Sequence, residues 1–307
     1  MLFSKPIQAL SAGLALFSGI QARALGNDGT EIIGVRDQDI VTWDDYSLSI
    51  NGERVMVFSG EFHPFRLPVV DLWLDVFQKV KAAGYNCISI YIDWALLEGK
   101  RGTFRSEGIF SLEPLFESAK EAGLYVIARP GPYINAEVSG GGFPGWMTKV
   151  QGALRTNSED FMNATDYYTK EIGEIVAKAQ ITNGGPVILF QPENEYQHAL
   201  DPYPMPEFPY WEAVQEQYRR SDIVVPYINN EAHMFGYIST DTESSVDIYG
   251  HDAYPLGFDC DNPSEWPEDG LPTDWLAENN EIAPDSPYTI PEVGTRPCTA
   301  IECRMIE

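Results

Sequence analysis

Apolar runs of strand length alternate with helical stretches along most of this chain, and this alternation constrains its fold more than any other feature. Most of the runs are continuously apolar, as strands buried on both faces are. The seven runs are Val55–Phe62, Cys87–Trp94, Leu124–Pro130, Pro186–Gln191, Val224–Asn229, Val246–Tyr249 and Tyr288–Pro291. The predicted helices between them are Val69–Ala83, Leu112–Ala122, Tyr167–Gln180 and Pro206–Arg219. Alternating strands and helices predict a parallel sheet with helices on its outside.

A barrel accounts for the polar residues of this sheet better than a doubly wound sheet does. A doubly wound sheet also alternates, but no glycine-rich nucleotide fingerprint follows the first strand. Polar residues instead gather just beyond the C-terminal ends of nearly every run, where a (β/α)8 barrel has its active site. We therefore predict an α/β fold with a TIM-type (β/α)8 barrel. It is expected to be incomplete, because about seven strands are present and the eighth is missing.

A β-hairpin is predicted ahead of the barrel. Tyr46–Ile50 alternates between polar and apolar residues, Asn51-Gly52 suits a type I′ turn, and Val55–Phe58 continues as a strand.

The first 24 residues have the pattern of a secretory signal peptide. Lys5 precedes an apolar stretch from Ile7 to Ile20, and Ala22-Arg23-Ala24 supplies small residues at a cleavage site. The stretch is too short for a comfortable membrane span. We expect a secreted, extracellular protein divided into residues 1–24 (signal), 25–292 (catalytic barrel) and 293–307 (divergent tail). Asn163-Ala164-Thr165 is then an available N-glycosylation site.

The charge of the chain excludes anionic partners. Forty-six acidic residues oppose 20 basic ones, which gives a formal net charge of −26. Such a chain repels nucleic acid and anionic membrane surfaces, so the predicted partner is a neutral molecule.

The cysteines are too few for a disulfide scaffold, and they do not indicate a metal site. Cys87 lies in an apolar run and is interpreted as a packed core thiol. Cys298 and Cys303 have no matching His or Cys pair, so zinc is not expected. An oxidised pair between Cys260 and one of the tail cysteines stays open.

Gly140–Gly142 is interpreted as a tight loop rather than a phosphate cradle, and no cofactor is predicted.

Two carboxylates at strand ends carry the predicted chemistry. The apolar run Pro186–Gln191 leads through Pro192 into Glu193, Asn194 and Glu195, and Glu292 ends the last run. An acidic surface loop is the alternative interpretation, but the run is too apolar to lie outside the core. Two strand-end glutamates roughly 5–5.5 Å apart are the arrangement of a retaining glycosidase.

Five long segments resemble the fungal β-galactosidases of glycoside hydrolase family 35. They are SGEFHPFRLP (59–68), YIDWALLEG (91–99), RPGPYINAEVSGGGFPGW (129–146), GGPVILFQPENEY (184–196) and YPLGFDC (254–260). The resemblance implies a retaining enzyme that removes terminal non-reducing β-D-galactose from oligo- or polysaccharides by double displacement. It also implies roles for single residues: Glu195 as acid/base and Glu292 as nucleophile. The residues implied to hold galactose are Tyr91, Asn135, Ala136, Glu137, Asn194 and Tyr254.

The end of the chain departs from the family. The tail Val293–Glu307 has no strand or helix period, whereas the family continues into further β-rich domains. We therefore expect the chain as written to fold poorly or to lack activity. Two other functions stay open: an inactive carbohydrate-binding remnant, and a retaining exo-glycosidase with another sugar preference.

The four histidines are interpreted as hydrogen-bonding wall residues: His63, His198, His233 and His251.

Overall fold

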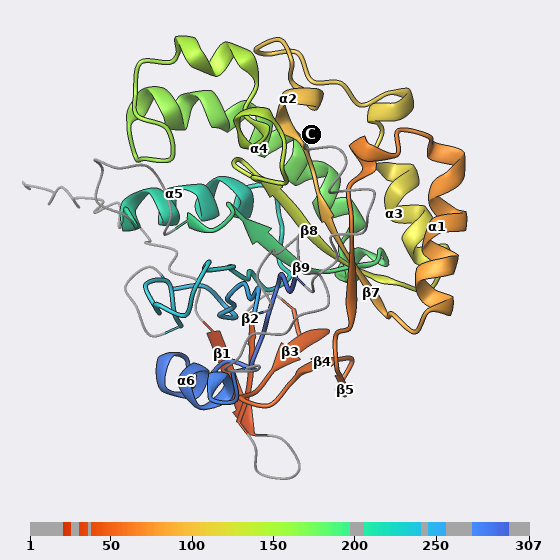
Figure 1. The fold of residues 1–307 in the computed structure, drawn as a ribbon, viewed down its shortest axis with the longest axis vertical. Helices are drawn as coiled ribbons and strands as arrows, with labels where there is room; N and C mark the ends of the chain where they lie inside the picture. Colours follow the sequence, from red (N-terminus) through yellow and green to blue (C-terminus); the bar gives the residue numbers. More distant parts are fainter. Residues whose placement is uncertain are drawn as a thin grey trace, which may run out of the picture.

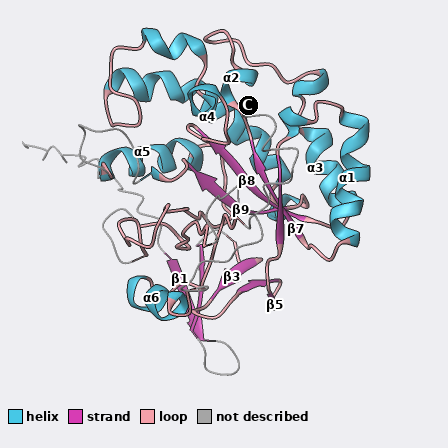
Figure 2. Cartoon of the chain, viewed as in Figure 1, coloured by secondary structure: helices cyan, strands magenta, loops and turns pink. Residues whose placement is uncertain are grey.

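Two β-sheets organise the chain in the computed structural model, which describes residues 21–25, 31–35, 38–196, 206–240, 245–255 and 272–294 (Figure 1). A small antiparallel sheet lies at one end, and a parallel sheet lies beside the helices (Figure 2). Among the described residues, no helix is long and apolar enough to cross a membrane.

The antiparallel sheet has the strand order β1-β2-β3-β4-β5. Its strands are β1 (Gln21–Leu25), β2 (Glu31–Val35), β3 (Val41–Trp43), β4 (Leu48–Ile50) and β5 (Glu53–Val55). The predicted hairpin is present: Asn51 and Gly52 both have positive φ angles, 53° and 80°, as a type I′ turn requires. However, β5 ends at Val55, so the strand predicted over Val55–Phe58 is wrong. The predicted cleavage point before Leu25 falls within β1, and the signal peptide stays a prediction.

The parallel sheet has the strand order β6-β7-β8-β9. These strands are β6 (Ser59–Phe62), β7 (Cys87–Tyr91), β8 (Tyr125–Gly131) and β9 (Val187–Pro192). They overlap the first four predicted runs, although β6 begins four residues after the predicted Val55 and β7 ends three residues before the predicted Trp94. They pair in the order in which they occur along the chain.

The last three predicted strands form isolated parallel bridges instead of continuous ladders. The bridges join Phe190 to Tyr227, Ile228 to Ile248, Glu231 to His251 and Ala253 to Val293. Side chains replace ladder bonds here: the Asp247 carboxylate accepts from the Tyr227 N–H, and Asn229 Oδ1 accepts from the Gly250 N–H. Seven consecutive barrel positions are therefore present, as predicted. Among the described residues, no bridge joins the seventh position to β6.

Helices follow most of the parallel strands, as the alternation predicts. They are α1 (Val70–Ala82), α2 (Trp94–Leu97), α3 (Glu113–Glu121), α4 (Glu159–Ala179), α5 (Phe208–Arg219) and α6 (Trp275–Ile282). α4 begins eight residues before the predicted Tyr167, because Phe161, Ala164 and Thr165 extend its buried face. Short 3-10 helices lie at Pro64–Arg66, Gly108–Phe110, Ser139–Gly142, Gly145–Lys149 and Ile181–Asn183.

The hairpin of β3 and β4 packs against the interior of the parallel sheet. Its side chains Val41 and Trp43 form one buried cluster with Cys87, Ile127 and Ile188. Cys87 is thus a core thiol, as predicted, and burial raises its pKa to about 12. Because Cys87 starts β7, this apolar packing fills the N-terminal end of the sheet interior. The polar side chains are left at the opposite end, where the strands finish.

Candidate active site

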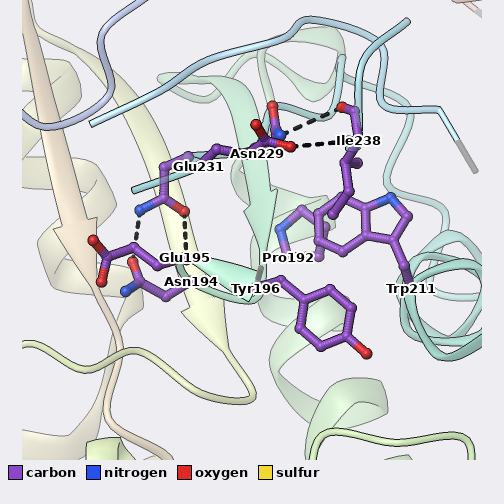
Figure 3. A pocket seen from close by; sticks show the side chains of 9 residues that line it. Pro192, Asn194, Glu195, Tyr196, Trp211, Asn229, Glu231 and Ile238 are labelled. Carbon is purple, nitrogen blue, oxygen red and sulfur yellow. Dashed lines mark hydrogen bonds between the residues drawn. The ribbon is translucent and has the colours of Figure 1, made fainter. Parts of the chain in front are cut away.

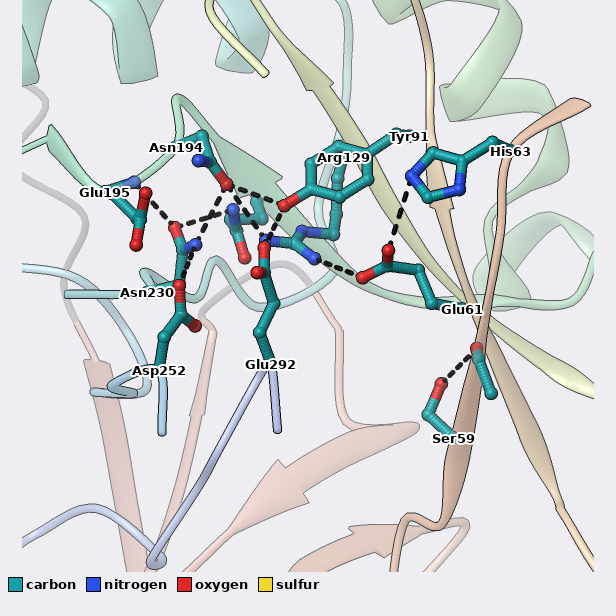
Figure 4. Close-up of polar contacts among 12 residues, drawn as sticks. Ser59, Glu61, His63, Tyr91, Arg129, Asn194, Glu195, Asn230, Asp252 and Glu292 are labelled. Atoms are coloured by element: carbon teal, nitrogen blue, oxygen red, sulfur yellow. Dashed lines mark hydrogen bonds and ion pairs between the residues drawn. The ribbon is translucent and has the colours of Figure 1, made fainter. Parts of the chain in front are cut away.

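Polar side chains from the C-terminal ends of the parallel strands converge on Glu292 (Figure 4). Tyr91 ends β7, Arg129 lies near the end of β8, and Asn194 follows β9. A parallel sheet brings these strand ends to one edge, so residues up to 201 positions apart in the sequence share hydrogen bonds.

Both oxygens of the Glu292 carboxylate are hydrogen-bonded. Oε1 accepts from the Tyr91 hydroxyl and lies 2.5 Å from Nη2 of Arg129. Oε2 accepts from the Tyr254 hydroxyl at 2.6 Å. Burial raises the pKa of Glu292, but the Arg129 charge and the hydrogen bonds from Tyr254 and Tyr91 outweigh it and hold this pKa below its usual value. Glu292 is therefore a carboxylate that stays ionised, as a nucleophile must.

Arg129 is the fully buried cation of the site, and the sequence analysis did not identify it. Its Nη2 also donates to Asn194 Oδ1 at 3.0 Å, and its Nη1 lies 3.4 Å from Oε2 of Glu61. The guanidinium lies 4.0 Å from the centre of the Tyr91 ring. A charged residue within an apolar strand was the available signal, because buried arginine is rare unless it is paired.

Asn194 is oriented by the donors around it. Its Oδ1 lies within hydrogen-bond distance of Arg129 Nη2, of Asn230 Nδ2 at 2.9 Å and of the Tyr91 hydroxyl at 2.7 Å. The single Tyr91 proton serves Asn194 or Glu292 at any moment. These donors fix Oδ1 as the acceptor, so Nδ2 is the side of the amide that can donate to a ligand.

The two glutamates of the Glu193-Asn194-Glu195 segment face different environments. Glu193 is fully buried away from Glu292, with Arg155 Nη2 2.7 Å from its Oε2 and the Tyr210 hydroxyl 2.5 Å from its Oε1. Glu195 instead lines a small pocket with Asn194, Asn229, Asn230, Glu231 and hydrophobic neighbours (Figure 3). Of the two, only Glu195 can serve as the second carboxylate of the site.

The pKa of Glu195 is raised, in contrast to that of Glu292. Burial is the largest cause, and the negative charge of Glu292 adds to it, against the opposing charges of Arg129 and Arg155. One carboxyl held ionised and a neighbour that keeps its proton to higher pH are the pattern of a nucleophile beside a general acid.

A third buried carboxyl, Asp252, lies behind this pair, and the sequence analysis missed it. Asn230 connects it to the site: Nδ2 of Asn230 donates to Asp252 Oδ2 at 2.9 Å, while Oδ1 accepts from the Glu195 N–H at 3.0 Å. Burial and the charges of Glu292 and Glu195 raise the pKa of Asp252 well above its usual value. A raised pKa lets Asp252 keep its proton to higher pH, which reduces the negative charge that the three carboxyls place in one site.

The predicted sugar-binding segment Asn135–Glu137, called the rim below, adjoins the site through Ala136, which shares a buried cluster with Tyr91. Asn135, Ala136 and Glu137 have φ angles of 53°, 48° and 48°, three consecutive left-handed residues. Such residues cost about 1–3 kcal/mol each, so contacts must hold them. Arg66 supplies two, because its Nη2 donates to the Ala136 carbonyl at 2.7 Å and to Glu137 Oε2 at 2.9 Å. The Asn135 and Glu137 side chains are exposed, and no hydrogen bond joins them to Glu292 among the described residues.

The histidines have different environments. The His63 ring stacks on Tyr91 with 5.4 Å between the ring centres, and its Nε2 lies 3.3 Å from Glu61 Oε1. Burial, reinforced by the Arg66 and Arg129 charges, lowers the pKa of His63 to about 4, so its ring is neutral at neutral pH. Nδ1 of the buried His251 lies 3.1 Å from the Asp252 carbonyl, and His233 contacts the Phe235 ring. His198, like Cys260, Cys298 and Cys303, falls outside the described residues.

Metal ligands do not cluster in this region. Across the part of the chain that the structure describes, no group of three or more His, Cys, Asp or Glu side chains is arranged to hold a metal ion. The expected tight loop at Gly140–Gly142 is present, with φ angles of 66°, 60° and 89°.

Sequence comparison identifies the family to which this site belongs. Residues 47–300 match the model of glycosyl hydrolases family 35. The chain belongs to this family. It is 60% identical over 256 residues to β-galactosidase A of Aspergillus oryzae and 56% identical over the same length to a β-galactosidase of Aspergillus niger. Both alignments cover 83% of this chain, but the chain spans only about a quarter of the relatives' length, 26% and 25%.

Solved structures of other glycosidases share the fold of this family 35 chain. An exo-β-1,4-mannosidase from an Opitutaceae bacterium matches with a TM-score of 0.59 at 13% identity, over 82% of this chain and 48% of its own. An FMN-binding β-glucuronidase from Facaelibacterium prausnitzii matches with a TM-score of 0.51 at 14% identity, over 91% and 39%. At such low identity these likenesses concern the fold alone, and they agree with the predicted barrel architecture.

Proposed function

We propose that this family 35 chain carries the catalytic site of a retaining β-galactosidase. The observation that carries the proposal is the pair of carboxyls with opposite pKa directions, Glu292 held ionised and Glu195 kept protonated to higher pH. The names of the most similar relatives support galactose as the sugar. The substrate class is a terminal, non-reducing β-D-galactoside of an oligo- or polysaccharide.

In the first step, Glu292 attacks the anomeric carbon. A bond forms between its carboxylate oxygen and that carbon while the bond to the leaving oxygen breaks, and the leaving oxygen takes the proton of Glu195. Arg129, Tyr91 and Tyr254 hold the Glu292 carboxylate in place for this attack.

In the second step, water replaces Glu292 on the galactosyl group. Glu195 is now a carboxylate and takes a proton from the water, whose oxygen bonds to the anomeric carbon as the bond to Glu292 breaks. Glu195 regains its proton and Glu292 its charge, so the cycle closes without a cofactor.

The sugar hydroxyls are proposed to bind Tyr91, Asn135, Ala136, Glu137, Asn194 and Tyr254. The oriented amide of Asn194 can donate through Nδ2, while Asn135 and Glu137 present exposed polar groups at the rim. A site that hydrogen-bonds a particular hydroxyl discriminates strongly against sugars lacking it, so these groups would select the axial hydroxyl of galactose.

The protein is also proposed to be secreted. This part of the proposal rests on the signal-like segment Met1–Ala24 and on the sequon at Asn163, whose side chain is exposed on α4. The N-glycan itself stays a prediction.

The test is hydrolysis of a panel of nitrophenyl β-glycosides, with galactoside as the preferred sugar. Trapping with a 2-deoxy-2-fluoro-β-galactoside, followed by peptide mass spectrometry, should label Glu292. The Glu292→Gln variant should lose hydrolysis of all substrates and should take no label. Galactose binding by calorimetry without nitrophenol release would instead indicate an inactive sugar-binding protein. Release from another glycoside alone would overturn the choice of sugar.

A further inference from the structure

A buried cluster of ionic and aromatic side chains lies behind the segment that carries Asn194 and Glu195. We call it the Arg155 cluster; it consists of Tyr133, Arg155, Glu193, Tyr196 and Tyr210. The Arg155 side chain is 6% exposed and the Glu193 side chain is fully buried. None of these residues reaches Glu292, and none of their side chains is assigned a role in the proposed reaction.

Arg155 makes three polar contacts with the Glu193–Glu195 segment. Its Nε and Nη2 lie 3.0 Å and 2.7 Å from Glu193 Oε2, and Nη2 also donates to the Asn194 carbonyl at 2.6 Å. The cluster is closed by Tyr196, whose hydroxyl donates to the Arg155 carbonyl at 3.0 Å. A planar guanidinium with several fixed donors can hold one backbone segment in one orientation, which an ammonium group cannot do.

The backbone of the Glu193–Glu195 segment has an unfavourable conformation that contacts such as these stabilise. Glu193 and Glu195 have positive φ angles of 61° and 42°, and Arg155 itself has a φ of 58°. Non-glycine residues keep this conformation only where surrounding contacts determine it. Reversal of either φ would turn the Glu195 side chain away from the pocket that it lines.

The same guanidinium connects this segment to the rim of the site. The Arg155 guanidinium lies 4.0 Å from the centre of the Tyr133 ring, and Tyr133 precedes the left-handed Asn135–Glu137 segment by two residues. Gly141 also lies against this ring, since a Cβ there would lie 1.9 Å from it. Tyr133 therefore packs closely against Gly141 as well as against Arg155.

We propose that Arg155 is a positioning residue that sets the orientation of Glu195 and Asn194 through its buried pair with Glu193 and couples that orientation to the Tyr133 loop. This inference rests on the proposed function, because it assigns a consequence to the role of Glu195 as acid/base. Arg155 contacts no reacting atom in this arrangement.

The test compares substrates that need protonation with substrates that do not. In Arg155→Lys, kcat/KM for phenyl β-galactoside should fall by roughly 100-fold, the scale of a 1 Å misplacement. For 2,4-dinitrophenyl β-galactoside it should fall by less than about 10-fold, because this leaving group departs without a proton from Glu195. A 2-deoxy-2-fluoro-β-galactoside titration corrects both values for the fraction of active protein.

Arg219→Lys is the matched control. Arg219 also pairs with a carboxylate, Asp247 at 2.6 Å, and its guanidinium lies 3.5 Å from the Tyr227 ring centre, but it makes none of the site contacts. Its variant should lose no more activity on one leaving group than on the other. Equal losses on both substrates in Arg155→Lys would overturn the inference and leave Arg155 a structural residue. If Arg155→Lys does not fold, Tyr133→Leu should show the same leaving-group dependence more weakly, and its absence there would also overturn the inference.

A structural measurement separates this inference from the proposed function. In a crystal structure of Arg155→Lys, the hydrogen bond from Glu195 N–H to Asn230, 3.0 Å in the parent chain, should be broken or lengthened. Retention of this bond with Glu195 still in its pocket would overturn the positioning role. A parent protein that hydrolyses neither galactoside would overturn the proposed function, while the crystal structure would still decide whether Arg155 positions Glu195.

Discussion

Arg129 Nη2 lies 2.5 Å from Oε1 of Glu292, so the proposed nucleophile is half of an ion pair. Burial of the carboxylate alone would favour its protonated form, and the guanidinium reverses that preference. The ionisation state of Glu292 therefore depends on its contact with Arg129.

Arg129→Lys should move the acidic limb of the kcat/KM profile to higher pH. A lysine cannot reach Glu292, Asn194 and Glu61 together, so the pKa of Glu292 should rise, and the limb should shift upward by about 1 pH unit. Profiles on a nitrophenyl β-galactoside would measure the shift. Arg220→Lys, at a surface pair with Asp166, is the control. An unchanged limb in Arg129→Lys would show that Arg129 does not set the ionisation of Glu292.

Removing either tyrosine hydroxyl should slow the first step. Tyr254→Phe takes the donor from Oε2 of Glu292, and Tyr91→Phe takes the donor from Oε1. A hydrogen bond to a charged group contributes about 1.5–3 kcal/mol, which corresponds to roughly 10- to 150-fold in kcat/KM. The Tyr91 variant should lose more, because its hydroxyl also serves Asn194. Losses confined to KM would contradict a role in holding the nucleophile.

Glu61→Gln should stabilise the protein at pH 8 and leave its stability unchanged near pH 4.5. Burial raises the pKa of Glu61 to about 7; the Arg129 charge opposes this shift and the Glu292 and Glu137 charges add to it. The folded protein thus keeps this proton to about pH 7, whereas the unfolded chain releases it near pH 4.5, so the free energy of unfolding falls between these values.

Solvent screening limits the gain from Glu61→Gln, because Glu61 is partly exposed. We expect on the order of 1 kcal/mol, or about 2–4 °C in Tm. Thermal melts of both proteins at the two pH values would measure it. A variant that melts below the parent at pH 8 would mean that the Glu61–Arg129 pair is net stabilising.

Secretion from a eukaryotic host should yield protein with one N-glycan at Asn163. Asn163 is exposed on α4, whereas Thr165 of the same sequon is buried and bonded to Gln217, so the sugar must be added before α4 packs. Endoglycosidase treatment should lower the mass of the parent and leave Asn163→Gln unchanged. Equal masses before and after treatment of the parent would disprove the site.

The continuous apolar runs predicted the first four parallel strands closely, because burial on both faces leaves a strong compositional signal. The later positions were harder to predict, since Asp247 and Asn229 supply side-chain acceptors that interrupt the ladders. No local pattern reports such replacement. Their place in the barrel emerges only when neighbouring strands are present.

The residues of the candidate site also differ in how far the sequence predicts them. Their position at strand ends and the family resemblance predict Glu195 and Glu292 as the catalytic pair. The two-residue period of a strand cannot decide between Glu193 and Glu195. Their side chains face different environments at two positive φ angles, which no sequence pattern predicts. The sequence does not predict the roles of Asn230 and Asp252, because these depend on hydrogen bonds from Asn230 to Asp252 and from Glu195 to Asn230. The three residues are far apart in the sequence and meet only in the folded chain.

Because Gly141 has no side chain, it leaves room for the Tyr133 ring that contacts Arg155, and this packing couples the three positions energetically. Any side chain there would displace the Tyr133 ring and, with it, the face on which Arg155 rests. A mutational scan that changes these positions singly should therefore record losses at each. The pair Gly141→Ala with Tyr133→Leu should cost less than the sum of its members, since the second change makes room for the first. Such epistasis would narrow the routes by which this rim can acquire a new substrate preference.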